Sequence, residues 1–153
     1  MRIGLGRGLS VFVVAAIAAS LMLVGSGASA ASSTVVLRTS LSGANVFPGP
    51  GDPDGSGKAI LLVRPSKGQI CFRLAVRKIG DAGGAHIHPG EAGTANPPII
   101  ALIPPDPTSH GCINDLDTGV LTQIVENPSA YYVNVHTPDF PGGAVRGQLG
   151  DDV

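Results

Sequence analysis

The chain has 153 residues, of which ten are basic and eleven acidic, so the formal net charge is −1. That balance argues against nucleic acid or an anionic membrane surface as the partner, because both attract strongly basic proteins. Glycine and proline are abundant at 22 and 13 residues and tryptophan is absent, a composition that favours many short strands joined by tight turns.

The first thirty residues have the three parts of a secretory signal peptide in the correct order. These are a basic start at Arg2 and Arg7, an apolar stretch over 9–24, and the small-residue cleavage sequence Ala28-Ser29-Ala30. A retained membrane helix is disfavoured because the apolar stretch is short for a full span. We expect cleavage after Ala30 and export of a single domain, 31–153, that has no integral membrane span. Without the two leader arginines, eight basic and eleven acidic residues remain, a formal charge of −3.

Short segments that are apolar or alternate between apolar and polar residues predict eight strands along the exported chain. The gaps between them nearly all contain glycine, proline, aspartate or asparagine, which are turn residues. No window shows a sustained helical period with a cap at its start. The pattern therefore predicts an all-β fold, an antiparallel Greek-key sandwich of the immunoglobulin-like or superoxide-dismutase-like kind. The predicted strands are 34–41, 58–64, 69–78, 85–88, 98–103, 120–125, 131–137 and 144–149.

Two pairs of acidic residues lie in turn-rich segments. Asp52 and Asp54 lie in PGPGDPDGSG at 48–57, and Asp115 and Asp117 form the second pair. Neither segment has the ligand spacing or the closing glutamate of a calcium-binding EF-hand loop. Both pairs are therefore interpreted as turn-forming and solubilising residues.

The only two cysteines of the chain are Cys71 and Cys112. In an oxidising compartment an isolated pair is most simply a disulfide. Alternation along its strand places Cys71 on the less apolar face, so the bond would attach the loop that carries Cys112 to the outside of a sheet. The alternative is a thiolate metal site beside His110, which would need a reducing environment.

Three histidines lie on predicted strands. In AHIHPG at 85–90, His86 and His88 project to the same side of an extended chain, about 6.5 to 7 Å apart. The segment AYYVNVHTPDFPGGAVRGQL at 130–149 is typical of a β-hairpin, and its alternation places His136 and Asn134 on the polar face. Arg146 continues that polar face on the second strand.

Three segments of the chain together resemble the chordin-repeat (CHRD) domain, which occurs in chordin and in many secreted bacterial proteins. They are LSGANVFPGPG at 41–51, AHIHPG at 85–90 and YYVNVHTPDFPGGAVRGQL at 131–149. The resemblance covers nearly all of the chain after residue 34. It implies a β-sandwich and an extracellular location, and it leaves the biochemical activity open. Members of this family usually carry an acidic residue in the phrase that reads Ala44-Asn45-Val46 in this chain.

A second resemblance is local. A His-x-His strand followed late in the chain by another strand histidine is similar to part of the copper site of copper/zinc superoxide dismutase. The bridging histidine and the zinc-binding segment of that enzyme have no counterpart, because His110 is the only histidine between His88 and His136. If the strands are neighbours, three imidazoles can converge on one ion, and nitrogen-rich sites of this kind suit copper or, less well, zinc.

The alternative for the same residues is a structural polar network. The imidazoles would then be hydrogen-bonded to backbone groups or to Asn134 and would hold the strands in register. Arg146 would form an ion pair with Asp139 or Glu91, which contributes little stability if it is exposed.

The sequence thus favours an exported, non-enzymatic binding or structural module whose partner is an extracellular protein or surface ligand. The alternative is a copper protein, either a carrier or a weak redox catalyst of superoxide-dismutase type. No nucleophile elbow, phosphate-binding glycine loop or zinc-protease helix supports a hydrolase. The candidate metal ligands are His86, His88 and His136, with Asn134 and Arg146 as neighbouring contact groups.

Overall fold

The computed structural model describes residues 33–150, so the predicted signal peptide lies outside the described residues and its cleavage stays a prediction. The described part contains eight strands, one α-helix and three short 3₁₀ helices. The strands are β1 (Val35–Ser42), β2 (Ser56–Arg64), β3 (Gln69–Arg77), β4 (Gly84–Pro89), β5 (Ile100–Leu102), β6 (Thr108–Ile113), β7 (Tyr131–His136) and β8 (Val145–Gln148). The helix is α1 (Thr118–Glu126), and the 3₁₀ helices are η1 (Gly43–Asn45), η2 (Pro65–Lys67) and η3 (Pro128–Ala130).

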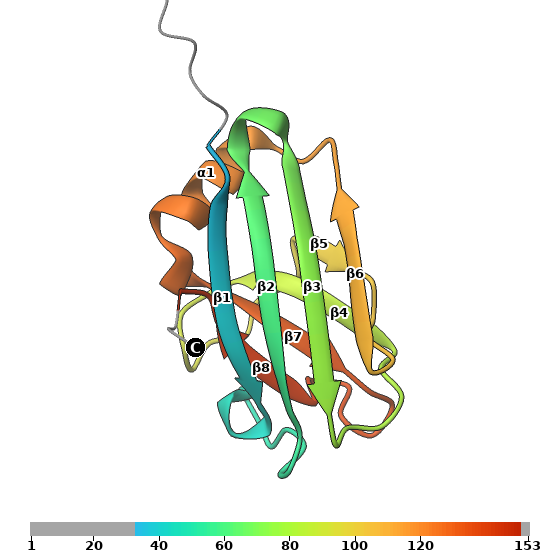
Figure 1. The fold of residues 1–153 in the computed structure, drawn as a ribbon. Helices are drawn as coiled ribbons and strands as arrows, with labels where there is room; N and C mark the ends of the chain where they lie inside the picture. Colours follow the sequence, from blue (N-terminus) through green and yellow to red (C-terminus); the bar gives the residue numbers. More distant parts are fainter. Residues whose placement is uncertain (1–32, 151–153) are drawn as a thin grey trace, which may run out of the picture.

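The eight strands form one antiparallel sheet in the order β5-β4-β7-β8-β1-β2-β3-β6. The sheet curls so that its two halves face each other as layers, with β1, β2, β3 and β6 in front of β4, β5, β7 and β8 in Figure 1. The halves are joined at β1 and β8 through the single pair Ser42 and Arg146. Three connections, from β3 to β4, β5 to β6 and β6 to β7, cross between the halves. The predicted antiparallel Greek-key sandwich is confirmed.

The core lies between the two layers and is formed by alternate residues of each strand. In β3 the inward side chains are Ile70, Phe72, Leu74 and Val76, as the alternation predicts, and all are at most 5% exposed. Burial of each such large apolar side chain stabilises the fold by roughly 1.5 to 3 kcal/mol. This inward alternation leaves the second face of every strand free to carry polar groups.

The prediction of a strand over 120–125 is wrong, because this segment lies within α1. Leu121 and Ile124 are both fully buried, a spacing of three that matches one face of a helix. The Asp117 carboxylate caps the helix by accepting a hydrogen bond from the Val120 amide at 2.9 Å. The β-branched residues of the segment are typical of a strand, and an aspartate in a turn-rich segment fits a turn as well as a helix cap.

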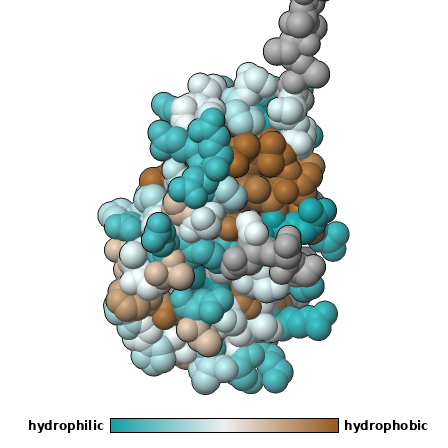
Figure 2. Space-filling view, turned by 90° about the vertical axis from the view of Figure 1, so that its left-hand side faces the viewer, coloured by the Kyte–Doolittle hydropathy of each residue, from teal (hydrophilic) through white to brown (hydrophobic). Residues whose placement is uncertain are grey.

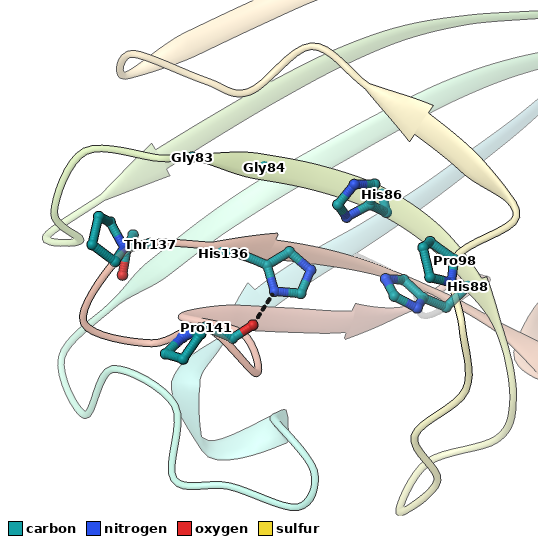
Figure 3. A pocket seen from close by; sticks show the side chains of 9 residues that line it. Gly83, Gly84, His86, His88, Pro98, His136, Thr137 and Pro141 are labelled. Atoms are coloured by element: carbon teal, nitrogen blue, oxygen red, sulfur yellow. Dashed lines mark hydrogen bonds between the residues drawn. The ribbon is translucent and has the colours of Figure 1, made fainter.

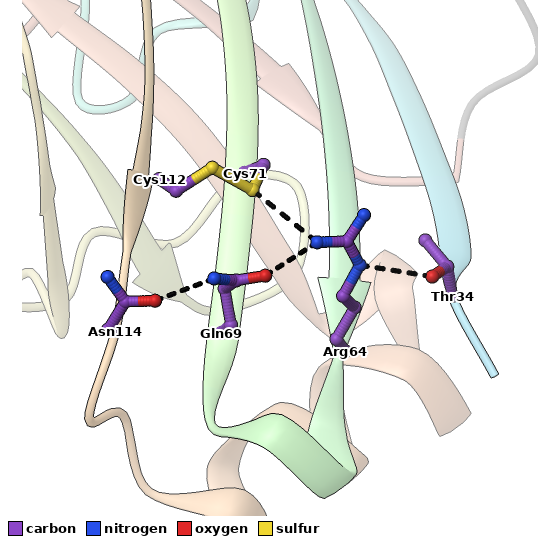
Figure 4. Close-up of a disulfide and its surroundings, with 6 residues drawn as sticks. All are labelled: Thr34, Arg64, Gln69, Cys71, Cys112 and Asn114. Atoms are coloured by element: carbon purple, nitrogen blue, oxygen red, sulfur yellow. Dashed lines mark hydrogen bonds between the residues drawn. A yellow bond between two sulfur atoms is a disulfide. The ribbon is translucent and has the colours of Figure 1, made fainter. Parts of the chain in front are cut away.

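A second correction concerns Cys112, which lies on the unpredicted edge strand β6 and not in a loop. In the β3–β6 ladder Cys71 lies directly opposite Cys112. The predicted disulfide is confirmed, with an S–S distance of 2.06 Å, and Figure 4 shows it on the outer side of the sheet. It excludes the thiolate metal site, since both thiols are in the bond. The sequence TSHGCI lacks apolar alternation, so β6 is recognisable only from its pairing with β3.

Within residues 33–150, no helix is long and apolar enough to cross a membrane. Four large apolar side chains are substantially exposed on the described surface: Val36, Phe47, Ile99 and Ile103. On the face seen in Figure 2, hydrophilic residues predominate around one larger apolar area on the right of its upper half.

Candidate metal centre

The three predicted histidines come together because β4 and β7 are neighbouring antiparallel strands. His86 and His88 lie on β4, and His136 lies at the end of β7. Strand alternation places all three on the outer face of this layer, as the sequence predicts. The register pairs are Gly84 with His136, His86 with Asn134, and His88 with Tyr132.

The imidazoles lie close enough to share one ion. The centroid of the His86 ring is 5.7 Å from that of His88 and 5.2 Å from that of His136, and the last two are 6.0 Å apart. One ring nitrogen of each histidine lies within 4.8 Å of the other two. Since metal–nitrogen bonds of about 2 Å span at most about 4 Å between two ligand atoms, a shift of under about 1 Å suffices for convergence. Figure 3 shows the three rings on the same side of β4 and β7.

Hydrogen bonds hold two of the rings by their Nδ1 atoms. Nδ1 of His88 lies 2.7 Å from the carbonyl oxygen of Asn96, and Nδ1 of His136 lies 2.9 Å from that of Pro141. A carbonyl only accepts, so each Nδ1 carries the proton and donates. This tautomer leaves the lone pair of each Nε2 available, which is the usual arrangement in histidines that bind metals.

The opposite nitrogens of these two rings lack partners within the described residues. His88 Nε2, His136 Nε2 and His86 Nδ1 are all buried without a hydrogen bond. In a purely structural polar network, each ring nitrogen would instead take part in a hydrogen bond. An unsatisfied buried polar atom costs about 1 to 3 kcal/mol, so three of them at one place indicate a site shaped for a ligand.

Two loops cover the outer face of β4 and β7 and produce this burial. The segment 90–99 supplies Asn96, and the turn from β7 to β8 supplies Pro141. Within that turn Gly143 has a φ of +137°, and a side chain there would lie 2.4 Å from Oδ1 of Asn134. Between the loops the histidines line a cavity of about 500 Å³ with Pro98 and Pro138 on its walls. A bound ion would therefore have space for a further ligand.

Tyr132 is the residue of this site that sequence reasoning missed. Its ring stacks on His88 with 4.8 Å between centroids and an interplanar angle of 9°. The Arg146 guanidinium lies 3.4 Å from the Tyr132 ring centroid. A guanidinium, a phenol and an imidazole therefore form one stack, which restrains the His88 ring. The available signal was the placement of Tyr132 on the polar face together with the histidines.

Arg146 and Asn134 lie beside the histidines without bonding to them. Arg146 is 2% exposed, and it donates to the backbone carbonyls of Thr94 and Glu91 and to Gln148. The alternative ion pair with a carboxylate of Asp139 or Glu91 does not form in the described structure. Asn134 donates to the Gly142 carbonyl at 3.1 Å, so it supports the turn.

Two further groups of predicted residues lie away from the centre. His110 is exposed on β6, opposite Arg73, and is not part of the cluster. Asp52 accepts a hydrogen bond from the Asp54 amide at 3.4 Å, which agrees with the turn interpretation of that pair.

Burial lowers the pKa of both His86 and His88 from the ordinary value of 6.5. For His86 the positive charge of His136 adds to this effect. For His88 the Asn96 carbonyl partly opposes it, while the charges of His86, His136 and Arg146 lower the pKa further. Both rings are therefore held neutral, the form that binds a metal ion.

The stability of the metal-free protein is expected to decrease as the pH falls from about 7.5 to 5.5. Unfolded histidines titrate near 6.5, so below that pH the unfolded chain takes up protons that folded His86 and His88 bind only at lower pH. The contribution of the two histidines to stability is thus complete well above pH 6.5 and is lost as the pH falls through and below that value. Thermal unfolding in the presence of a chelator measures this trend. His88→Gln should make the melting temperature depend less on pH. A wild-type melting temperature that stays constant or rises on acidification would contradict the lowered pKa of His86 and His88.

The fold and the site define a single antiparallel β-sandwich that carries a half-buried three-histidine cluster on one outer face. The family model described as the CHRD domain matches residues 37–149. The chain belongs to the CHRD domain family, as its three sequence segments predicted. No curated protein and no solved structure matches the chain. These comparisons show no similarity to copper/zinc superoxide dismutase.

Proposed function

We propose that this CHRD domain is an exported module that binds one copper ion through His86, His88 and His136. The observation that carries the proposal is the set of three buried ring nitrogens without hydrogen-bond partners, one from each histidine. The disulfide and the family membership fit an extracellular domain.

The donor set favours copper over zinc. The three ligands are neutral imidazoles, and the cluster includes no carboxylate or thiolate. Imidazole suits both metals, but copper(II) binds a given nitrogen site more tightly than zinc(II) along the divalent series. Structural zinc sites also close with a fourth protein ligand. Here the cavity beside the rings leaves the fourth position to a small molecule or to solvent.

The protein's own residues hold the ligands in place before any ion arrives. The Asn96 and Pro141 carbonyls set the tautomers of His88 and His136, and the Tyr132 ring holds the plane of His88. Preorganisation of this kind reduces the ordering cost of binding. The module is proposed as a carrier or binding protein because an ion held at an open cavity can be both accepted and released.

Metal titration of protein made without a histidine tag tests the proposal. After removal of metals by a chelator, calorimetry with copper(II) should give saturable one-to-one binding, with weaker binding of zinc(II). Electron paramagnetic resonance of the copper complex should show coupling to several nitrogen nuclei. Absence of saturable copper binding would overturn the proposal and leave the structural network as the role of the histidines.

A further inference from the structure

On the strands of the layer formed by β1, β2, β3 and β6, which lies opposite the histidines, all the charged side chains are positive. Strands β1, β2, β3 and β6 contain five lysine or arginine residues and no aspartate or glutamate, the five being Arg38, Lys58, Arg64, Arg73 and Arg77. The Arg64 guanidinium donates hydrogen bonds to the side-chain oxygens of Thr34 and Gln69. The side chains of the other four cations have no hydrogen bond or ion pair with another residue of 33–150. They are exposed and available to an external anion.

The register gathers these four cations into one area of the sheet, whose strands lie side by side in Figure 1. Neighbouring strands are about 4.8 Å apart, and side chains on one face repeat every 6.5 to 7 Å or so. The four charges therefore spread over about 10 Å across the strands and about 14 Å along them. The three rows of neighbours are Arg38-Ile60-Arg73, Ser40-Lys58-Ala75 and Ser42-Ser56-Arg77.

A groove lies within this area. It has a volume of about 560 Å³, and its lining includes short side chains at Ser40, Ser56 and Ala75 and the two cations Lys58 and Arg77. Short residues leave room above the sheet, while the serines offer hydroxyl groups. The surface thus combines positive charge with hydroxyl donors and acceptors along one channel.

We propose that this basic groove, defined by Ser40, Ser56, Lys58, Ala75 and Arg77, binds an acidic polysaccharide. Carboxylate or sulfate groups would pair with Lys58 and Arg77, and sugar hydroxyls would contact the serines. Arg38 and Arg73 would receive anionic groups further along the same chain.

The same surface fits other polyanions less well. Single-stranded nucleic acids need aromatic side chains for base stacking, and Phe72, the only Phe, Tyr or Trp of these four strands, is 4% exposed in the core. Anionic membranes are bound by basic surfaces that also insert apolar side chains, but the one large apolar side chain of these four strands that is substantially exposed, Val36, lies beyond the row of Arg38, away from the groove. The groove lies on the opposite layer from the histidines, so this inference does not depend on metal binding.

Binding of heparin and of polygalacturonate to the exported domain, measured by calorimetry at about 0.15 M salt, tests the proposal. Lys58→Glu is compared with Lys67→Glu, an exposed residue of η2 that gives the same change in charge. At least one polysaccharide should bind, and Lys58→Glu should weaken its affinity by about tenfold or more, against less than about twofold for Lys67→Glu. Ala75→Leu fills the groove without changing charge and should weaken binding as well.

Equal losses in Lys58→Glu and Lys67→Glu would mean diffuse electrostatic attraction and would overturn the proposal. So would full affinity in Ala75→Leu, an absence of binding to both polysaccharides, or tighter binding to single-stranded DNA or to phosphatidylserine vesicles. Circular dichroism and melting temperature establish that each variant is folded, and a misfolded Ala75→Leu is replaced by Ala75→Val.

Discussion

His136→Ala is expected to weaken copper binding by at least about 100-fold and to leave the metal-free protein folded. Residues that merely orient metal ligands contribute 10- to 100-fold to affinity, so removal of a ligand itself should cost about that much or more. The substitution removes the hydrogen bond to the Pro141 carbonyl but also removes a buried, unpartnered Nε2 atom. These effects oppose each other, and the free energy of unfolding should change by no more than about 1 kcal/mol.

His110→Ala is the matched control, because it removes an exposed histidine on the other layer. Copper titration should not distinguish this variant from the wild type. Chemical denaturation of both variants, with metal removed, supplies the stability comparison. Wild-type affinity in His136→Ala would remove His136 from the ligand set. A stability loss of several kcal/mol in metal-free His136→Ala, with no copper binding by the wild type, would establish the structural role instead.

Replacement of both cysteines by serine is expected to lower the free energy of unfolding by about 4 kcal/mol and the melting temperature by roughly 15 °C. The bond joins residues 41 positions apart in sequence, and its loss enlarges the conformational freedom of the unfolded chain. Cys112 is exposed and Cys71 is half-buried, so serine leaves no large cavity. Denaturant unfolding monitored by circular dichroism measures the change.

The location of the bond predicts where the double variant loosens. The disulfide attaches β6, an edge strand of the sheet, directly to β3. Hydrogen exchange should therefore quicken mainly in β6, while the β-rich circular dichroism spectrum persists. Reduction of the wild type should reproduce the loss of stability. An unchanged free energy of unfolding in both the variant and the reduced wild type would show that the cross-link contributes nothing.

Both predictions concern residues that were identifiable from local patterns. A period of two determines which side chains of a strand share a face, so the grouping of His136 with Asn134 followed from the order of residues alone. The same period placed Cys71 on the outer face, and the turn residues between strands indicated an all-β fold. Family likeness supplied the remaining constraint, since it linked segments that are far apart in the chain.

The local sequence was insufficient to predict secondary structure in two segments whose residues are compatible with more than one kind of element. Val120 to Val125 resembles a strand by composition, but Leu121 and Ile124 are buried on one face of a helix that Asp117 caps. Similarly, β6 has a polar, glycine-containing sequence that forms a strand because β3 offers an unpaired edge. Tertiary packing outweighed intrinsic propensity in both segments, through burial of one helix face in the first and through pairing with β3 in the second.

Residue order was enough to predict the sandwich, the disulfide partners and the shared face of the three histidines. The packed fold was needed to show that Asn96 and Pro141 hold the rings of His88 and His136 while a nitrogen of each histidine stays unpartnered. It also placed Arg146 against Tyr132 and not in an ion pair. The physical reason is that strand periodicity assigns a side chain to a face, whereas its partners come from loops and neighbouring strands whose positions depend on the packing of the whole chain.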